Sequence, residues 1–117
     1  MRAPGRSKFG NVPTIVDGQR FDSKLEAARY QLLKLRERAG EITGLQCQEP
    51  FILTAGPGVV VGKYKADFSY FDNIKRERVV EDCKGGKATQ TPLFNWKRKH
   101  LRAEHKIEIT IVEKATA

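Results

Sequence analysis

Two aspartates and a lysine near the middle of the chain are the residues best suited to chemistry. Asp67 lies within the mainly apolar segment 64–70, and Asp82 precedes Lys84 with one residue between them. Two carboxylates about 4 Å apart repel each other by about 4 kcal/mol at an effective dielectric constant of about 20. A divalent cation turns that repulsion into binding, and oxygen ligands favour Mg²⁺, with Mn²⁺ as a substitute. We therefore predict a metal site on Asp67 and Asp82, with the backbone carbonyl of Cys83 as a further ligand.

Such a site is suited to hydrolysis of a phosphodiester bond. A bound metal lowers the pKa of a water molecule and offsets charge on the phosphate. Lys84, beside it, would orient the attacking water or neutralise charge in the transition state. An Asp-x-Lys sequence is also common among the ordinary exposed charges of a hairpin, so the elements around it decide between a site and a surface.

Neighbouring strands must bring the two aspartates together. We expect Phe71 to pair with Arg76 across a polar turn. Asp67 then lies opposite Val80. Asp82 becomes the diagonal neighbour of Asp67 on the same face, about 7–8 Å away. A slip of one residue would turn Asp67 to the opposite face, so the prediction depends on this register.

A long helix is predicted before these strands, over residues 23–39. Its apolar residues recur at three- and four-residue steps and would share one buried face. They are Leu25, Ala28, Leu32, Leu35 and Ala39. Ser23 and Glu26 fit a capping box at the start of the helix, and Gly40 ends it.

The remaining pattern predicts one α/β domain with a central mixed sheet flanked by helices. A second helix begins at Pro92, with Thr91 as its N-cap, and runs to about residue 103. Extended segments are expected at 42–53, 59–71, 78–84 and 107–112, with a short strand or hairpin at 13–21. Residues 12–117 form this single domain, and residues 1–11 are expected to be a flexible basic arm.

Composition indicates a negatively charged partner. The chain has 117 residues and a net charge of +8, from 22 Lys and Arg against 14 Asp and Glu. A basic surface attracts polyanions, of which nucleic acid is the commonest, although a basic protein without such a partner is the alternative. No apolar stretch approaches the roughly 18 residues of a membrane span. Cys47 and Cys83 form no zinc-binding pattern, and we expect them to be reduced thiols in a cytoplasm.

These residues resemble the core of the PD-(D/E)XK nuclease superfamily. In that pattern an Asp on one strand precedes an acidic-x-Lys motif on the next; here Ala66-Asp67 replaces Pro-Asp, and Asp82-Cys83-Lys84 supplies the motif. Segments 21–30, 40–42, 46–48 and 51–53 are similar to the front half of small phage-encoded nucleases. Phage junction-resolving endonucleases and archaeal Holliday-junction resolvases share this layout. The resemblance spans about residues 18–113 and implies a restriction-endonuclease-like fold.

The resemblance also suggests roles for residues outside the motif. Glu26 matches the helix carboxylate that completes the metal site, although it also fits a capping box. Gln46 or Gln48 would contact the site or the DNA, unless both belong to a polar strand face. Trp96 would pack in the core or touch a base, and His100 and His105 receive no role. The basic residues expected to contact DNA phosphates, unless they are simply solvated, are Arg2, Arg6, Lys8, Lys87, Lys97 and Lys99.

Together these features predict a Mg²⁺-dependent endodeoxyribonuclease with Glu26, Asp67, Asp82 and Lys84 as its catalytic residues. The resemblance favours branched DNA, particularly four-way junctions, and a symmetric junction favours a homodimer. A phage-encoded protein of this kind would act in the cytoplasm of a bacterial host. The alternatives are a nicking or restriction-type endonuclease without junction preference, and a basic DNA-binding module that has lost catalysis.

Overall fold

A four-stranded mixed sheet with two helices forms the body of the protein. The computed structural model describes residues 12–85 and 90–115. Along the chain the elements are β1 (Thr14–Val16), β2 (Gln19–Phe21), α1 (Lys24–Arg38), β3 (Ile42–Thr54), β4 (Val60–Asp72), β5 (Glu77–Cys83), α2 (Pro92–His105) and β6 (Ile109–Val112). Strands β3, β4 and β5 are antiparallel neighbours, and β6 adds in parallel beside β5. The predicted α/β class with a mixed central sheet is confirmed, and it is compatible with a restriction-endonuclease-like core.

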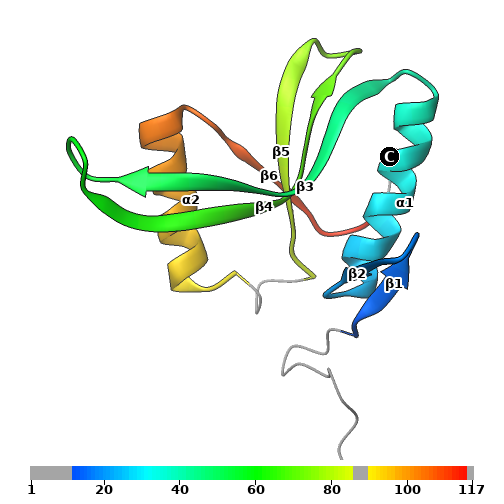
Figure 1. Ribbon diagram of the computed structural model, residues 1–117, viewed down its shortest axis with the longest axis horizontal. Helices are drawn as coiled ribbons and strands as arrows, with labels where there is room; N and C mark the ends of the chain where they lie inside the picture. Colours follow the sequence, from blue (N-terminus) through cyan, green and yellow to red (C-terminus); the bar gives the residue numbers. More distant parts are fainter. Residues whose placement is uncertain (1–11, 86–89, 116–117) are drawn as a thin grey trace, which may run out of the picture.

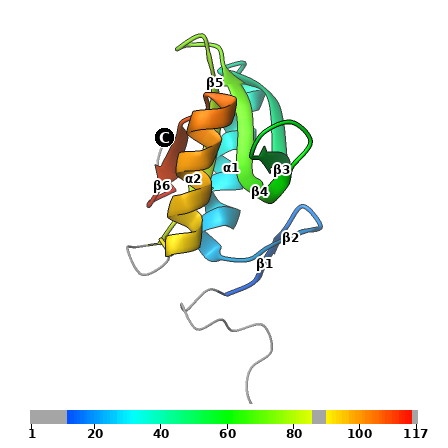
Figure 2. The ribbon, with the colours of Figure 1, turned by 90° about the vertical axis from the view of Figure 1, so that its left-hand side faces the viewer.

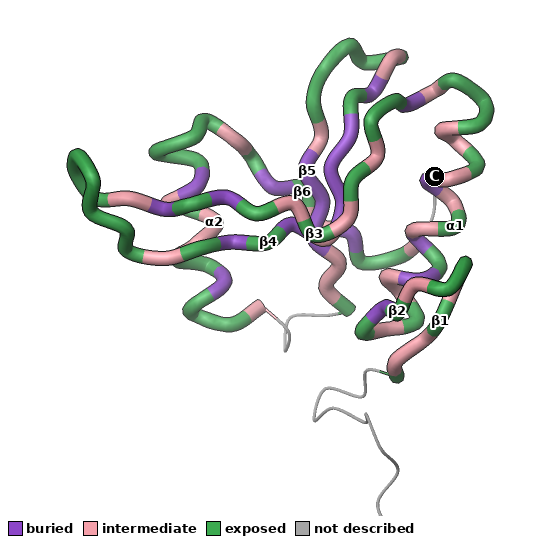
Figure 3. Tube along the Cα trace, viewed as in Figure 1, coloured by how far each residue is buried: buried purple, intermediate pink, exposed green. Residues whose placement is uncertain are grey.

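The two helices lie on either side of the point where the strands converge (Figures 1 and 2). Each helix has its own hydrophobic core. The core of α2 includes Phe51, Leu53, Tyr64, Ala66, Val80, Phe94, Leu101 and Ile109. The core of α1 includes Phe21, Ala27, Leu33, Ile42, Phe68 and Tyr70. Buried residues gather at the convergence of the strands, whereas the ends of the hairpins are exposed (Figure 3). Strand β4 contributes to both cores and connects them.

The start of α1 is as predicted, but its buried face is not. The side chain of Ser23 accepts a hydrogen bond from the backbone N–H of Glu26, at 3.1 Å, and Gly40 takes a positive φ of 78° just after the helix. The buried residues, however, are Ala27, Arg29 and Leu33, and Leu35 is 57% exposed. The prediction of the buried face was wrong because it used apolar residues alone, whereas the charged Arg29 lies on the face that is buried.

The hairpin between β4 and β5 has a different register from the one expected. Phe71 pairs with Arg78, two residues beyond the expected Arg76, and Asp72 pairs with Glu77, so the four-residue turn begins one residue later. The Oδ1 atom of Asp72 accepts hydrogen bonds from the N–H groups of Ile74 and Lys75, at 2.9 and 3.0 Å. This side-chain bonding stabilises the turn at the later position.

The shift has an even number of residues, which preserves the face of each side chain. Phe68 pairs with Glu81. The described pairing ends there, and Asp67 and Asp82 are the next residues of the two strands. The predicted pairing of Asp67 with Val80 is wrong, because Val80 pairs with Ser69.

Thr91 begins α2 as predicted. Its side chain accepts a hydrogen bond from the N–H of Phe94, at 3.2 Å, and Pro92 is the first residue of the helix. The helix ends at His105, two residues beyond the predicted end, where Lys106 adopts the left-handed conformation. Its N-terminal turn lies beside the end of β5, which places Phe94 against the predicted catalytic strand.

Candidate active site

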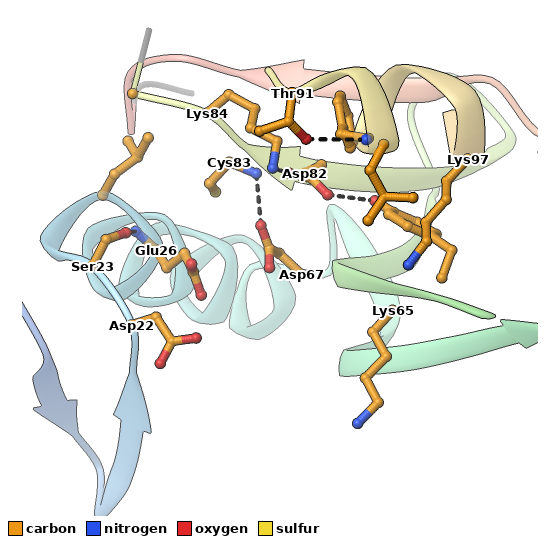
Figure 4. A pocket seen from close by; sticks show the side chains of 15 residues that line it. Asp22, Ser23, Glu26, Lys65, Asp67, Asp82, Cys83, Lys84, Thr91 and Lys97 are labelled. Carbon is orange, nitrogen blue, oxygen red and sulfur yellow. Dashed lines mark hydrogen bonds and ion pairs between the residues drawn. The ribbon is translucent and has the colours of Figure 1, made fainter. Parts of the chain in front are cut away.

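The four predicted catalytic residues line one cleft of about 430 Å³. Glu26 comes from the first turn of α1, Asp67 from β4 and Asp82 from β5, and Lys84 follows directly after β5. Figure 4 shows these side chains around the opening, with the start of α2 forming another wall. The chain therefore brings together residues that are as much as 58 positions apart in the sequence (84 minus 26).

Asp67 is fixed by hydrogen bonds from both neighbouring strands. Its Oδ2 atom accepts a bond of 2.7 Å from the backbone N–H of Cys83, and its Oδ1 atom accepts a bond of 3.4 Å from the amide of Gln48. Burial and the negative charge of Asp82 raise the pKa of Asp67 to about 6. The contact with Gln48 agrees with the expectation that one of the two glutamines reaches the site, whereas Gln46 is exposed and pairs with Ser69.

Asp82 is almost completely buried and has two side-chain partners. The hydroxyl of Tyr64 donates a 2.6 Å hydrogen bond to its Oδ2 atom, and Lys84 Nζ lies 3.1 Å from its Oδ1 atom. The same ammonium lies 4.3 Å from the centre of the Phe94 ring. Lys84 is thus held between a carboxylate and an aromatic face, with its charge directed into the cleft.

Tyr64 is a site residue that the sequence did not reveal. Burial, followed by the charge of Asp82, raises its pKa, so the phenol keeps its proton and remains a donor. Tyr64 stands at the start of the apolar segment that contains Asp67, and on sequence grounds it reads as an ordinary core aromatic. Its contact with Asp82 depends on the antiparallel pairing of β4 with β5.

Glu26 lies in the first turn of α1, as the capping pattern predicts, and its side chain also reaches the cleft, as the resemblance implies. Its backbone is capped by Ser23, and its side chain lines the cleft. Burial, together with the negative charges of Asp67, Asp22 and Asp82, raises the pKa of Glu26 to about 8. The charges that contribute after burial come from other carboxylates around the cleft, and a shared cation would offset them.

A buried ion pair connects α1 to β5 behind the cleft. Arg29 binds Glu81 through two hydrogen bonds, of 2.9 and 2.6 Å, and the hydroxyl of Tyr70 also donates to Glu81. Arg29 and Glu81 are 6% and 1% exposed. Arg29 follows Glu26 by about one helical turn and Glu81 precedes Asp82, so this pair sets the distance between α1 and the strand that carries the site.

The predicted DNA contacts are distributed over several places. Lys97 lines the cleft. Lys65 lines it too, although it is not among the predicted DNA contacts. Lys99 instead borders a separate hollow on the outer side of α2, with Asn95, Arg98 and Arg102. The other predicted contacts, Arg2, Arg6, Lys8 and Lys87, lie outside the described residues, as does the proposed arm 1–11.

The two histidines and Trp96 hold α2 in place. His100 and His105 each form a 2.7 Å hydrogen bond to a backbone carbonyl of β3, those of Thr54 and Ile52 respectively. Trp96 is 42% exposed, and its ring centre lies 5.2 Å from that of His100. These contacts fasten the helix to the β3–β4 hairpin, away from the carboxylates.

The cleft holds no preformed metal cage. Within residues 12–85 and 90–115, no group of three or more His, Cys, Asp or Glu side chains already has the arrangement that would hold a metal ion. The Cys83 atom that contacts the carboxylates is its backbone nitrogen, and metal binding by its carbonyl stays a prediction. Burial raises the pKa of the Cys83 thiol, which makes it a poor metal ligand at neutral pH.

Fold and site together define an α/β protein with a cleft that is lined by carboxylates and lysines and lies between the sheet and its helices. The chain belongs to the DUF1064 family, whose model matches residues 6–116 and whose description is a protein of unknown function. Neither the curated proteins nor the solved structures contain a match to it. Neither helix in the described part of the chain is long and apolar enough to cross a membrane.

Proposed function

We propose that the protein is a metal-dependent DNA endonuclease that hydrolyses phosphodiester bonds in the cleft formed by Glu26, Asp67 and Asp82. The observation that carries this proposal is the convergence of these carboxylates, from three different elements, beside the ammonium of Lys84. The net charge of +8 supports nucleic acid as the substrate, because the carboxylates alone would repel a phosphate backbone.

The residues of the cleft fit a divalent cation. All three carboxylates offer oxygen ligands, which Mg²⁺ and Mn²⁺ prefer. The Oδ2 atoms of Asp67 and Asp82 each accept one protein hydrogen bond and keep a further lone pair for a metal. Burial, and then the neighbouring carboxylates, raise the pKa values of Glu26 and Asp67, so deprotonation of both groups without a cation is costly. A cation would supply the missing positive charge.

The protein side chains then have separate tasks in hydrolysis. When bound, Mg²⁺ would lower the pKa of a water molecule and stabilise charge on the phosphate. Tyr64 keeps Asp82 in one orientation, and the N–H of Cys83 does the same for Asp67. Lys84 presents its ammonium to the oxygens of the reacting phosphate, where negative charge increases in the transition state.

The preferred substrate is proposed to be branched DNA, in particular the four-way junction. Support comes from the resemblance of the motifs to junction-resolving nucleases, and from the absence of a helix-turn-helix or zinc-finger pattern in the sequence that could read bases. A homodimer would set two such clefts on opposing strands of a symmetric junction. A nicking or restriction-type endonuclease has the same cleft chemistry without the preference for branches.

A plasmid assay tests the nuclease proposal. The wild-type chain should convert supercoiled plasmid to nicked and linear forms in Mg²⁺ and leave it intact in EDTA. Asp82→Asn should abolish cutting. Asp17→Asn is the matched control, because Asp17 is exposed, does not line the cleft, and has a positive φ of 53° that asparagine tolerates. Equal cutting by wild type and Asp82→Asn, or no cutting by a folded wild type that binds DNA, would refute the proposal.

Substrate preference requires a separate measurement. In Ca²⁺, which should allow binding without cutting, a four-way junction should compete at least about tenfold better than a linear duplex of equal length, a difference of about 1.4 kcal/mol. Light scattering should give the mass of a dimer at the same concentration. Equal affinities or a monomeric mass would refute junction resolution and leave the nuclease proposal standing.

A further inference from the structure

The long hairpin of β3 and β4 has one covered face and one open face. Pro50 pairs with Lys65 and Ile52 with Lys63, and all four side chains are exposed. We call these four residues the outer ribbon face. The pairs that alternate with them, Phe51 with Tyr64 and Leu53 with Gly62, face the other way, and Phe51, Leu53 and Tyr64 are buried in the core of α2. Figure 1 shows this hairpin running past α2 from the centre of the molecule.

Packing against α2 prevents the outer ribbon face from turning inward. Side chains alternate strictly along a strand, so burial of Phe51 and Tyr64 keeps Pro50, Ile52 and Lys65 on the other side. Ile52 is 47% exposed, a substantial fraction for a large apolar side chain. Within the part of the chain that the structure describes, no element covers this face.

The outer ribbon face is positively charged and leads to the carboxylate cluster. Residues 50–66 contain no Asp or Glu, and their charged residues are Lys63 and Lys65. The next residue is Asp67, and Lys65 already lines the cleft. Because Lys63 and Lys65 are two residues apart, their side chains lie on the same side of β4, and Lys65 is the nearer of the two to Asp67 in the sequence.

We propose that the outer ribbon face is a DNA-docking surface, on which Lys63 and Lys65 contact phosphates on one side of the phosphate that reacts in the cleft. This inference rests on the proposed function for the identity of its ligand. Lys63 lies four residues from Asp67, which is about 13 Å along a strand that rises about 3.3 Å per residue. One DNA strand rises about 3.4 Å per nucleotide, so the surface spans about four nucleotides. Pro50 and Ile52 lie opposite Lys65 and Lys63 on the neighbouring strand, where they would contact the sugars.

Charge favours DNA over a second copy of the chain as the occupant of this face. Exposed strands of apolar residues can pair with each other, and lysines on such strands oppose that pairing. Two copies meeting face to face would bring four lysines together. A phosphate backbone, in contrast, neutralises both lysines of one chain and releases counterions.

Fluorescence anisotropy with a labelled linear duplex in Ca²⁺ tests the inference. The variant Lys63→Gln/Lys65→Gln removes both charges from the outer ribbon face. Lys75→Gln/Lys114→Gln is the matched control, with the same change of charge at exposed residues that border a different groove. Each phosphate contact contributes about 0.9 to the slope of log affinity against log salt concentration. The test variant should therefore lose about 1.8 from the slope and bind at least about tenfold more weakly, while the control stays close to wild type.

Equal losses in both variants would overturn the inference, because they would reflect net charge rather than a surface. A wild-type affinity in the test variant would also overturn it, as would a change in its mass by light scattering with unchanged DNA binding. Circular dichroism establishes that each variant is folded. Since binding in Ca²⁺ requires no cleavage, a protein that docks DNA here but cuts nothing in Mg²⁺ would refute the nuclease proposal alone.

Discussion

Replacing Arg29 by methionine should destabilise the protein strongly, because it leaves the charge of Glu81 buried without its main partner. Glu81 is 1% exposed and receives two hydrogen bonds from the guanidinium of Arg29. Removing one member of a buried, hydrogen-bonded ion pair costs about 3–5 kcal/mol. A domain of this size is stable by about 5–15 kcal/mol in total. Arg29→Met should therefore remove a large part of the free energy of unfolding.

The double variant Arg29→Met/Glu81→Leu separates the charge effect from the packing effect. Apolar residues of similar volume often replace a buried ion pair at little cost, so the double variant should be more stable than Arg29→Met alone. Urea unfolding followed by circular dichroism gives both values, with Arg20→Gln as an exposed control expected within about 0.5 kcal/mol of wild type. A loss below about 1 kcal/mol for Arg29→Met would show that the pair does not hold α1 to β5. The same would follow if the loss in the double variant equalled the sum of the losses in Arg29→Met and Glu81→Leu.

Three further predictions concern the cleft, α1 and the docking surface. In EDTA, the raised pKa of Glu26 means that the folded state binds the Glu26 proton more tightly than the unfolded chain, so the free energy of unfolding should fall as pH rises from about 4.5 to about 8. Glu26→Gln should flatten this dependence and raise the melting temperature at pH 8. An unchanged pH profile in the variant would contradict the burial of Glu26 beside other carboxylates. Leu33→Ala should lower the free energy of unfolding by about 2–5 kcal/mol, whereas Leu35→Ala should change it by no more than about 0.5 kcal/mol. Equal losses in urea unfolding would contradict the burial of Leu33 and support the buried face predicted from the sequence. Neutral methylphosphonate linkages should slow cutting when placed within about four nucleotides on one side of the cleavage point, and symmetric interference would exclude a one-sided contact through Lys63.

The elements of the fold could be predicted because their signals are local. Ser23 and Thr91 are placed at helix starts by their own hydrogen bonds to the next turn, and these caps were predicted from residue types alone. The alternation of side chains brought Asp82 and Lys84 to one face, and the structure places both in the cleft with Asp67 and Glu26. To predict such a motif it is enough to know on which face of the strand its side chains lie, and a register shift of two residues does not change that face.

The missed features depend on contacts between distant residues. The buried face of α1 follows from the pairing of Arg29 with Glu81, 52 residues away, which no periodicity of apolar residues can reveal. The register of β4 and β5 follows from the turn that the side chain of Asp72 stabilises. Tyr64 joins the site only because the antiparallel pairing of β4 with β5 brings its hydroxyl to Asp82. Each of these features needed three-dimensional packing to become visible.

Single-turnover cleavage of an end-labelled DNA duplex in saturating Mg²⁺ tests the central claim most directly. Asp67→Asn, Asp82→Asn and Lys84→Met should each lower the rate by at least about a hundredfold while DNA affinity in Ca²⁺ changes little. Because the residues act as one unit, Asp67→Asn/Asp82→Asn should cut no more slowly than the worse single variant. Wild-type rates in any of the three single variants, with each protein folded and bound to DNA, would contradict the assignment of this cleft as the active site.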